Sequence, residues 1–515
     1  MHPASVRATH RRRRRGPGGG AWRRSPRAAA CGRRGRRAPG RAPRDPPRRR
    51  PRLRARGRRS CRADRESERS RWRTRLGEGS RGSAPSAERG RRYAAGVPDL
   101  EFYFDITCPY AYLASTVIED VARRCGATLR PRPILLGGIF AARKVPQNLS
   151  EVLPPPKAVH NLADMQRQAA LLGADVPKVP AGHPRRSVEA LRALLVAGAE
   201  RMDLIRALFR AYWVEGRDLT DRGQIGEVLA ACGEDPKAVL ARIDDPATKD
   251  ELRRRTDEAL AAGVFGVPTF VVDGELYWGV DRLPMVERAL GHPPPEVRAE
   301  PEYPVEVYFD YSSPFAYLGL VRAERLFGNR AVYRPMLLGA VFRAVGQVDV
   351  PLAVFSDAKR RYAMTDLTRQ AAELGVPFRF PSRFPMRTTL PLRVTLRSGC
   401  LATAEGRKLA HAIFRAYWAE DRDISDPQVV AGLCDAHGFD GKALVADAGT
   451  DGAKRALFDA TERAVSRGVF GAPTFIVDTP DGPELFWGSD RATWALQAAA
   501  GDARLRTELW PGGTG

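Results

Sequence analysis

Two places in the sequence join a sulfur or hydroxyl side chain to a following proline. These are Cys108-Pro109 and Ser313-Pro314, and each ends a short run of apolar and aromatic residues. Such a run indicates a buried strand, and proline is favoured in the first turn of a helix. Each Cys or Ser is therefore predicted to cap a helix, where unpaired N–H groups and the helix dipole favour a thiolate. That thiolate could belong to the residue itself or to a ligand.

The two Cys/Ser-Pro corners belong to an internal duplication. The segment LFRAYWVEGRDLTD at residues 208–221 recurs as IFRAYWAEDRDISD at residues 413–426, with 9 of 14 positions identical. The segment GVFGVPTFVVD recurs as GVFGAPTFIVD at the same offset of 205 residues. We therefore predict two tandem domains, copy one at residues 97–292 and copy two at residues 303–502. The shared aromatic residues are expected in the core.

The predicted elements follow one order in both copies. In copy one they are strands at 100–106 and 128–136, helices at 162–172, 188–199, 204–213 and about 249–262, strands at 269–272 and 275–278, and a last helix from about 281. Copy two opens with matching strands at 305–311 and 331–338. The order β-α-β, inserted helices, α-β-β-α predicts an α/β fold of two thioredoxin-like domains, each with a helical insertion.

A second proline stands at an unusual place in each copy. Val267-Pro268 and Ala472-Pro473 come directly before a predicted strand. In thioredoxin layouts this X–Pro bond is cis, and it exposes the preceding backbone N–H and C=O to a thiol ligand. Because cis X–Pro bonds are uncommon, such a bond marks a deliberate feature.

With these motifs in place, the sequence resembles the DsbA-like thioredoxin superfamily, in the branch of 2-hydroxychromene-2-carboxylate isomerases and kappa-class glutathione transferases. The motifs that carry the resemblance are FD-x-x-S-P-x-x-Y from Phe309 to Tyr317, G-V-P-T at 266–269, and W-G-x-D-R at 278–282 and 487–491. They cover both copies. The resemblance implies a glutathione-dependent isomerase in aromatic catabolism, which acts by reversible thiolate addition to a small aromatic substrate.

The resemblance also implies roles for particular residues. Ser313, and Cys108 in its place in copy one, would contact the sulfur of glutathione as catalytic residues. The residue before the cis proline would pair with the glutathione backbone, and the Asp-Arg pair would contact its γ-glutamyl end. A family lysine and asparagine have counterparts as well. The implied glutathione-binding residues are Asn148, Lys157, Val267, Pro268, Asp281, Arg282, Lys359, Ala472, Pro473, Asp490 and Arg491.

The sequence departs from the family pattern in copy two. Val350 stands where copy one has Asn148, with Gln347 and Asp349 as nearby substitutes. The resemblance therefore implies this contact for copy one and leaves it open for copy two.

Two other functions stay open. The resolving cysteine of a C-x-x-C motif is replaced by Ala111 and Ala316, which argues against dithiol exchange. A glutathione transferase or a monothiol disulfide oxidoreductase could still work through Cys108. In the other alternative, the duplication builds a non-catalytic thioredoxin-like binding module. We expect the two copies to pack together as an intramolecular pseudo-dimer, or two chains to form a homodimer.

The net charge of +25 comes from the first 95 residues, which hold 33 Arg, no Lys and 6 acidic residues. We predict that this Arg-rich tail is disordered because it has too few apolar residues to form a core. It could be a translated upstream region, an organelle transit peptide or a nucleic-acid-binding arm. The domains are nearly neutral, so nucleic acid binding would rest on the tail alone.

Cysteine and histidine usage excludes further classes. The seven Cys and seven His show no metal-ligand spacing, so we predict no metal site. No apolar run approaches the roughly 20 residues of a membrane span. With no signal peptide and no disulfide framework, a cytoplasmic location is expected.

Overall fold

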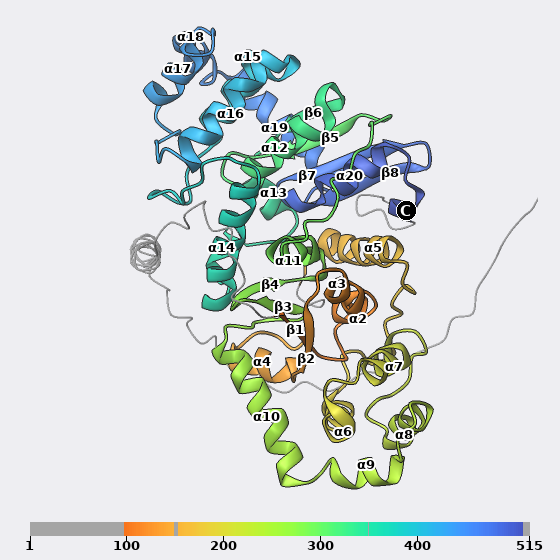
Figure 1. The fold of residues 1–515 in the computed structure, drawn as a ribbon. Coiled ribbons are helices and arrows are strands. Elements are labelled where there is room, and N and C mark those ends of the chain that lie inside the picture. The colour runs from red at the N-terminus through yellow and green to blue at the C-terminus, as the bar shows by residue number, and fades with distance from the viewer. Residues whose placement is uncertain (1–96, 149–152, 349, 508–515) are drawn as a thin grey trace, which may run out of the picture. The chain divides into compact units, whose positions relative to one another are not determined.

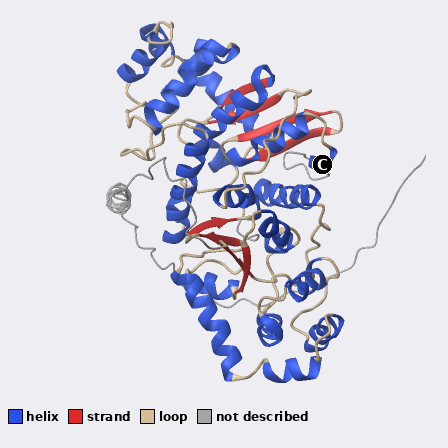
Figure 2. Ribbon diagram, viewed as in Figure 1, coloured by secondary structure: helices blue, strands red, loops and turns tan. Residues whose placement is uncertain are grey.

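The computed structural model describes residues 97–507 except 149–152 and 349. The tail expected to be disordered, residues 1–95, lies outside the described residues. Each copy contains one four-stranded sheet together with many helices (Figures 1 and 2).

Copy one keeps the predicted order of elements. They are β1 (Asp99–Phe104), α2 (Pro109–Ser115), α3 (Ile118–Arg124), β2 (Thr128–Pro133), α4 (Leu136–Ala142), α5 (Pro155–Leu172), α6 (Val188–Gly198), α7 (Met202–Trp213), α8 (Arg222–Ala231), α9 (Pro236–Arg242), α10 (Pro246–Ala261), β3 (Thr269–Val272), β4 (Glu275–Trp278), the 3₁₀ turn η2 (Val280–Arg282) and α11 (Leu283–Ala289). The predicted strands at 269–272 and 275–278 are confirmed at their bounds.

Copy two repeats this order with the same layout of strands. Its elements are β5 (Val305–Phe309), α12 (Pro314–Phe327), η3 (Gly328–Arg330), β6 (Ala331–Pro335), α13 (Leu338–Ala344), η4 (Pro351–Val354), α14 (Asp357–Glu373), α15 (Thr389–Ser398), η5 (Cys400–Ala402), α16 (Ala404–Trp418), α17 (Pro427–Asp435), α18 (Gly441–Asp447), α19 (Asp451–Ser466), β7 (Thr474–Thr479), β8 (Gly482–Trp487), η6 (Ser489–Arg491), α20 (Ala492–Ala499) and η7 (Ala503–Leu505).

Both sheets have the same topology. The strand order is β2-β1-β3-β4 in copy one and β6-β5-β7-β8 in copy two. The first pair is parallel and the other two pairs are antiparallel. In register, Phe102 lies opposite Pro131 and Phe270, and the Phe102 and Phe270 rings stack with centroids 5.7 Å apart. This is the predicted thioredoxin-like layout with inserted helices, and the fold class is confirmed.

The first strand of each copy ends earlier than predicted because an aspartate turns the chain. Asp105 accepts hydrogen bonds from the backbone of Thr107 at 3.0 Å and of Leu136 at 2.7 Å. Asp310 accepts from the backbone of Ser312 and Leu338 in the same way. These side-chain bonds replace the sheet ladder. They place the residue three positions after each aspartate, Cys108 or Ser313, at the start of a helix.

The aromatic residues shared by the repeats are core, as expected. Phe209, Tyr212 and Trp213 are at most 1% exposed. The indole of Trp213 donates to the carbonyl of Ile106 at 2.8 Å. Trp418 donates to Tyr311 at the same distance in copy two. The inserted helices are therefore tied to the strand end that leads into the Cys/Ser-Pro corner.

One long helix of each copy lies against the sheet edge of the other copy. Helix α5 contacts β8 and η7 (Figure 1), and buried Arg167 on it donates to the carbonyls of Leu485 and Leu505. Helix α14 makes the matching contact with β4, where Arg369 donates to the carbonyl of Leu276 at 2.6 Å. The edge strands β4 and β8 are thus covered within the chain.

Candidate functional site

The two Cys/Ser-Pro corners form the same contact with the backbone before the second proline. Cys108 caps α2, and its Sγ donates to the carbonyl of Val267 at 3.1 Å. Ser313 caps α12, and its Oγ donates to the carbonyl of Ala472 at 2.9 Å. Both the Val267-Pro268 and Ala472-Pro473 bonds are cis. Each corner therefore brings a thiol or hydroxyl onto the cis-proline loop, across 159 residues of sequence.

The two caps differ in their own hydrogen bonds. Ser313 Oγ also accepts from the N–H of Ala316 at 3.1 Å, whereas Cys108 makes no side-chain cap bond. Burial raises the pKa of Cys108 to about 12, because it outweighs the N–H groups of Ala111 and Tyr110, which lower it. Cys108 is therefore a neutral thiol near pH 7. The helix start does not make Cys108 itself anionic, because burial of the thiol outweighs the effect of the helix N–H groups.

The backbone N–H groups before the cis prolines are open to a ligand. Among the described residues, none accepts a hydrogen bond from the N–H of Val267 or of Ala472. Both residues line one cavity of about 1670 Å³, which also contacts Cys108 and Ser313. Because backbone donors are normally paired when buried, these two N–H groups suit a peptide-like ligand.

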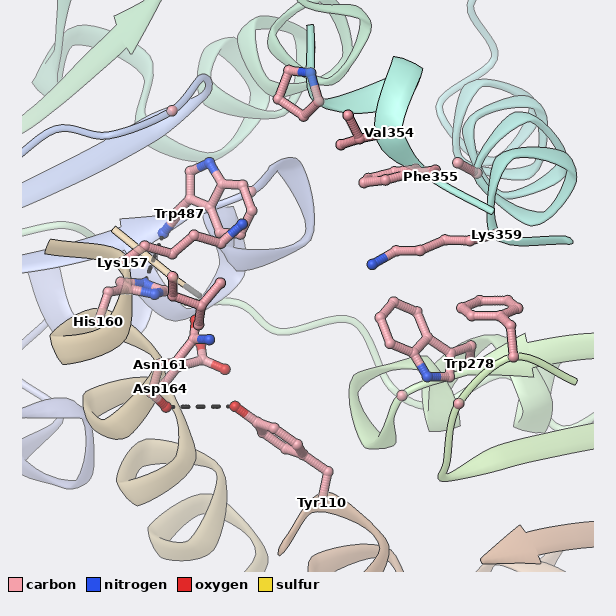
Figure 3. Close-up of a pocket in the computed structure, with 18 of the residues that line it drawn as sticks. Tyr110, Lys157, His160, Asn161, Asp164, Trp278, Val354, Phe355, Lys359 and Trp487 are labelled. Atoms are coloured by element: carbon pink, nitrogen blue, oxygen red, sulfur yellow. Dashed lines mark hydrogen bonds between the residues drawn. The ribbon is translucent and has the colours of Figure 1, made fainter. Parts of the chain in front are cut away.

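Each candidate lysine lies beside a tryptophan of the other copy. Lys157 on α5 places its Nζ 4.5 Å from the ring centre of Trp487 in copy two. Lys359 on α14 places its Nζ 5.0 Å from the ring centre of Trp278 in copy one. Both lysines reach into the cavity between the two tryptophans (Figure 3). Each cis-proline loop is therefore paired with the lysine of the other copy.

Both lysines are held without a compensating carboxylate. Among the described residues, neither Nζ forms an ion pair. Burial and the nearby charge of Lys359 lower the pKa of Lys157 to about 8, and burial also lowers the pKa of Lys359. Two half-buried ammonium groups that line one cavity make that cavity favourable for anionic groups such as carboxylates.

The predicted Asp-Arg pairs meet at the contact between the copies. Arg282 binds Asp366 at 2.9 and 3.2 Å and Asp490 at 2.7 Å. Arg491 binds Asp164 and Asp281 in the mirrored arrangement. The guanidinium groups are thus engaged by carboxylates of the other copy. Burial would raise the pKa of Asp490, but Arg282 and Arg491 hold it below its usual range.

The asparagine counterpart lines the same cavity. Asn148 lines it in copy one, and Gln347 and Val350 line it in copy two. Asp349 lies outside the described residues.

Sequence reasoning missed two residues that lie one helical turn after the lysines. His160 follows Lys157 on α5, and its Nε2 accepts from the backbone N–H of Trp487 at 3.3 Å. Tyr362 follows Lys359 on α14, and its Oη accepts from the N–H of Trp278 at 2.9 Å. The spacing of three, which places side chains on one helix face, was the signal that could have identified them.

Metal ligands do not gather at this site. In the part of the chain that the structure describes, no three His, Cys, Asp or Glu side chains form a group able to hold a metal ion. Within the same residues, no helix has the length and apolar character to span a membrane.

Comparison with known proteins agrees with this geometry. The family description "DSBA-like thioredoxin domain" matches residues 99–291 and 304–498, so the chain belongs to the DsbA-like thioredoxin family. Within that family it is a tandem member of the 2-hydroxychromene-2-carboxylate isomerase and kappa-class glutathione transferase branch.

Each of the similar proteins matches a stretch about as long as one domain. A 2-hydroxychromene-2-carboxylate isomerase of Sphingobium xenophagum is 32% identical over 37% of this chain and 97% of its own length. Glutathione S-transferase kappa 1 of Rattus norvegicus is 28% identical over 39% of this chain and 96% of its length. A solved structure of a 2-hydroxychromene-2-carboxylate isomerase covers 37% of this chain and 94% of its own, with 29% identity and a TM-score of 0.34.

Proposed function

We propose that this protein is a glutathione-dependent isomerase of the 2-hydroxychromene-2-carboxylate type. The observation that carries the proposal is the Ser313 corner. There a helix-capping hydroxyl lies on the cis-proline loop, and an unpaired lysine of the other copy faces the same cavity. The names of the relatives support the same activity.

The residues of the cavity fit glutathione. The peptide offers amide groups to the unpaired N–H of Ala472 and carboxylates to Lys157. Asp490 and Arg491 are the candidates for its γ-glutamyl end. In copy one, Val267, Pro268, Asp281, Arg282 and Asn148, with Lys359, would do the same.

Bound glutathione would supply a removable thiolate, whose addition to a conjugated double bond allows that bond to rotate before the thiolate leaves. In water a thiol of pKa about 8.5 is only a few per cent ionised at pH 7. Ser313 would turn its Oγ–H from the carbonyl of Ala472 toward the sulfur. The amide of Ala316 already bonds to that oxygen, which strengthens the hydroxyl as a donor.

The same lysines would also hold the anionic part of an aromatic substrate, because an ammonium group has three hydrogen-bond donors. Their aromatic neighbours Trp278, Phe355 and Trp487 provide flat apolar walls (Figure 3). A ring can stack there while a carboxylate meets an ammonium group. Because each lysine serves the cis-proline loop of the other copy, an intramolecular pseudo-dimer is the proposed working unit.

The alternative through Cys108 has less support. A monothiol oxidoreductase needs an attacking thiolate, and burial raises the pKa of Cys108 to about 12. The test is to assay Ser313→Ala, Cys108→Ala and the double variant for glutathione-dependent isomerisation. We expect Ser313→Ala to lose most of the activity. Full activity in the double variant would overturn the proposal.

A further inference from the structure

The two lysines of the cavity differ in the aromatic rings around their ammonium groups. Figure 3 shows both groups in the space between Trp487 and Trp278. Lys157 Nζ lies 4.5 Å from the ring centre of Trp487. Lys359 Nζ lies near two rings, 5.0 Å from the centre of Trp278 and 4.5 Å from that of Phe355. Because aromatic faces attract a cation, Lys359 is held more firmly as an ammonium ion than Lys157.

The amine of Lys157 is open to the cavity. Lys157 is half-buried, and it lines the cavity that also contacts Ser313. No described residue forms a hydrogen bond or an ion pair with its Nζ, and this atom does not belong to the described nitrogen atoms that are buried without a partner. A ligand in the cavity can therefore contact the nitrogen directly.

Burial and a like charge favour the unprotonated amine of Lys157. Together with the nearby charge of Lys359, burial lowers the pKa of Lys157 to about 8. The aspartates on the two helices that carry the lysines, Asp164 and Asp366, bind arginines instead. At pH 7 about a tenth of Lys157 is then unprotonated, roughly 200 times the share of an ordinary lysine. A desolvated lysine next to another cationic group is an activated nucleophile.

The proposed substrate class carries a matching electrophile. In a 2-hydroxychromene-2-carboxylate, one carbon bears a hydroxyl group, the ring oxygen and a carboxylate, so the compound is the cyclic hemiketal of a 2-oxo acid. Opening of the ring gives a ketone that lies next to the carboxylate and is conjugated to the double bond. A carboxylate bound to the ammonium group of Lys359 would bring this ketone toward the amine of Lys157.

We propose that Lys157 forms an imine with the keto group of an aromatic 2-oxo acid whose carboxylate is bound by Lys359. The lone pair of the nitrogen adds to the carbonyl carbon. The carbonyl oxygen takes one proton from the amine and one from solvent and leaves as water, while a C=N bond forms. The iminium nitrogen keeps one proton and a positive charge, so the cavity remains favourable for the carboxylates of glutathione.

This imine would give the chain a second way to activate its substrate, one that needs no glutathione. A conjugated iminium withdraws electrons from the neighbouring double bond more strongly than the ketone does. It would therefore favour addition of the thiolate held at the Ser313 corner. The inference rests on the proposed function for its class of substrate, but imine formation itself can be measured without isomerisation.

Trapping with a hydride tests the imine in the wild-type protein. The full-length chain is incubated at pH 7 with phenylpyruvate, an aromatic 2-oxo acid, and sodium cyanoborohydride. The hydride converts an imine into a stable secondary amine, which peptide mass spectrometry locates. We expect Lys157 to be labelled at least about tenfold faster than exposed Lys442 in the same molecules. Labelling of Lys157 no faster than that of Lys442 would overturn the inference.

Variants of Lys359 test the anchoring of the carboxylate. Lys359→Arg keeps the positive charge, so the rate of labelling at Lys157 should stay within about threefold of the wild-type rate. Lys359→Met removes both the anchor and the like charge, and it should lower that rate at least about tenfold. Lys442 provides the internal reference in each sample. Equal labelling of Lys157 in the two variants would overturn the role of Lys359.

The outcomes distinguish this inference from the proposed function. If the wild-type protein shows no glutathione-dependent isomerisation but Lys157 is labelled preferentially, the isomerase proposal fails and the imine stands. If the wild-type protein isomerises its substrate but Lys157 is labelled no faster than Lys442, the imine fails and the isomerase proposal stands.

Discussion

Arg491 and Asp164 form a buried bidentate ion pair, with hydrogen bonds of 2.7 and 3.0 Å between side chains 327 residues apart. Arg282 and Asp366 form its counterpart. These pairs fasten η2 and η6 to the helices that carry the cavity lysines. The ion pairs that join the two copies therefore also hold the lysines of the site in position.

Breaking this buried pair should destabilise the protein far more than breaking a surface pair. We expect Asp164→Asn to lower the free energy of unfolding by about 3 kcal/mol, because Arg491 would be left partly uncompensated away from water. The control is Asp120→Asn, which removes the exposed partner of Arg123 and should cost at most about 0.5 kcal/mol. Urea denaturation measures both. Equal losses would show that the buried pair contributes no more than an exposed one.

Binding of an anionic ligand should weaken as Lys157 loses its proton. Because the pKa of Lys157 is lowered to about 8, its charge is present below pH 8 and is lost as the pH rises through that value. We expect the affinity for S-methylglutathione, which has no thiol proton, to fall between pH 7 and 9. Calorimetry over this range measures it.

The matched variant for this pH dependence is Lys157→Arg. Arginine stays charged throughout this range, so the variant should show a flatter profile than the wild-type protein. The ammonium group of the ligand titrates equally in both experiments. Identical slopes would exclude Lys157 as the titrating group.

The glycine before Ala472 keeps Trp487 in place. A Cβ at Gly471 would lie within 3.0 Å of three atoms of the Trp487 ring, too close for any real contact. We expect Gly471→Ala to displace the ring, to lower the Tm by several degrees and to weaken glutathione binding at least tenfold. Gly432 on α17 has open space around it, so Gly432→Ala should instead stabilise the protein by about 0.5–1 kcal/mol. Unchanged binding in Gly471→Ala would contradict this role of the ring position.

Cys108 should react slowly with alkylating agents. Burial raises its pKa to about 12, and only the thiolate is a strong nucleophile. In the native protein at pH 7.5 we expect iodoacetamide to modify Cys108 at least 100-fold more slowly than free glutathione in the same solution. Peptide mass spectrometry of samples taken at successive times measures the rate of alkylation. Modification of Cys108 as fast as glutathione would support the disulfide-exchange alternative.

Local patterns were enough to predict the fold. Apolar runs predicted the strands, the prolines predicted where α2 and α12 begin, and the repeat predicted a second sheet of the same topology. The errors lie at strand ends such as residues 105–106. There the side chain of Asp105 bonds to the backbone of Leu136, 31 residues away. The hydrophobic pattern cannot predict such a hydrogen bond.

Sequence motifs identified the candidate residues, but they did not predict which of these residues contact each other across the two copies. The sequence alone determined that each copy has a capped helix, a lysine on a later helix and an Asp-Arg pair after its last strand, because these depend on neighbours within a few residues. Only the tertiary structure decided that Lys157 lies on Trp487, that Arg491 binds Asp164 and that His160 accepts from the backbone of Trp487. These contacts join residues more than 300 positions apart. They arise from the burial of unpaired sheet edges between two similar domains, which is a property of the assembled surfaces and not of any local stretch of chain.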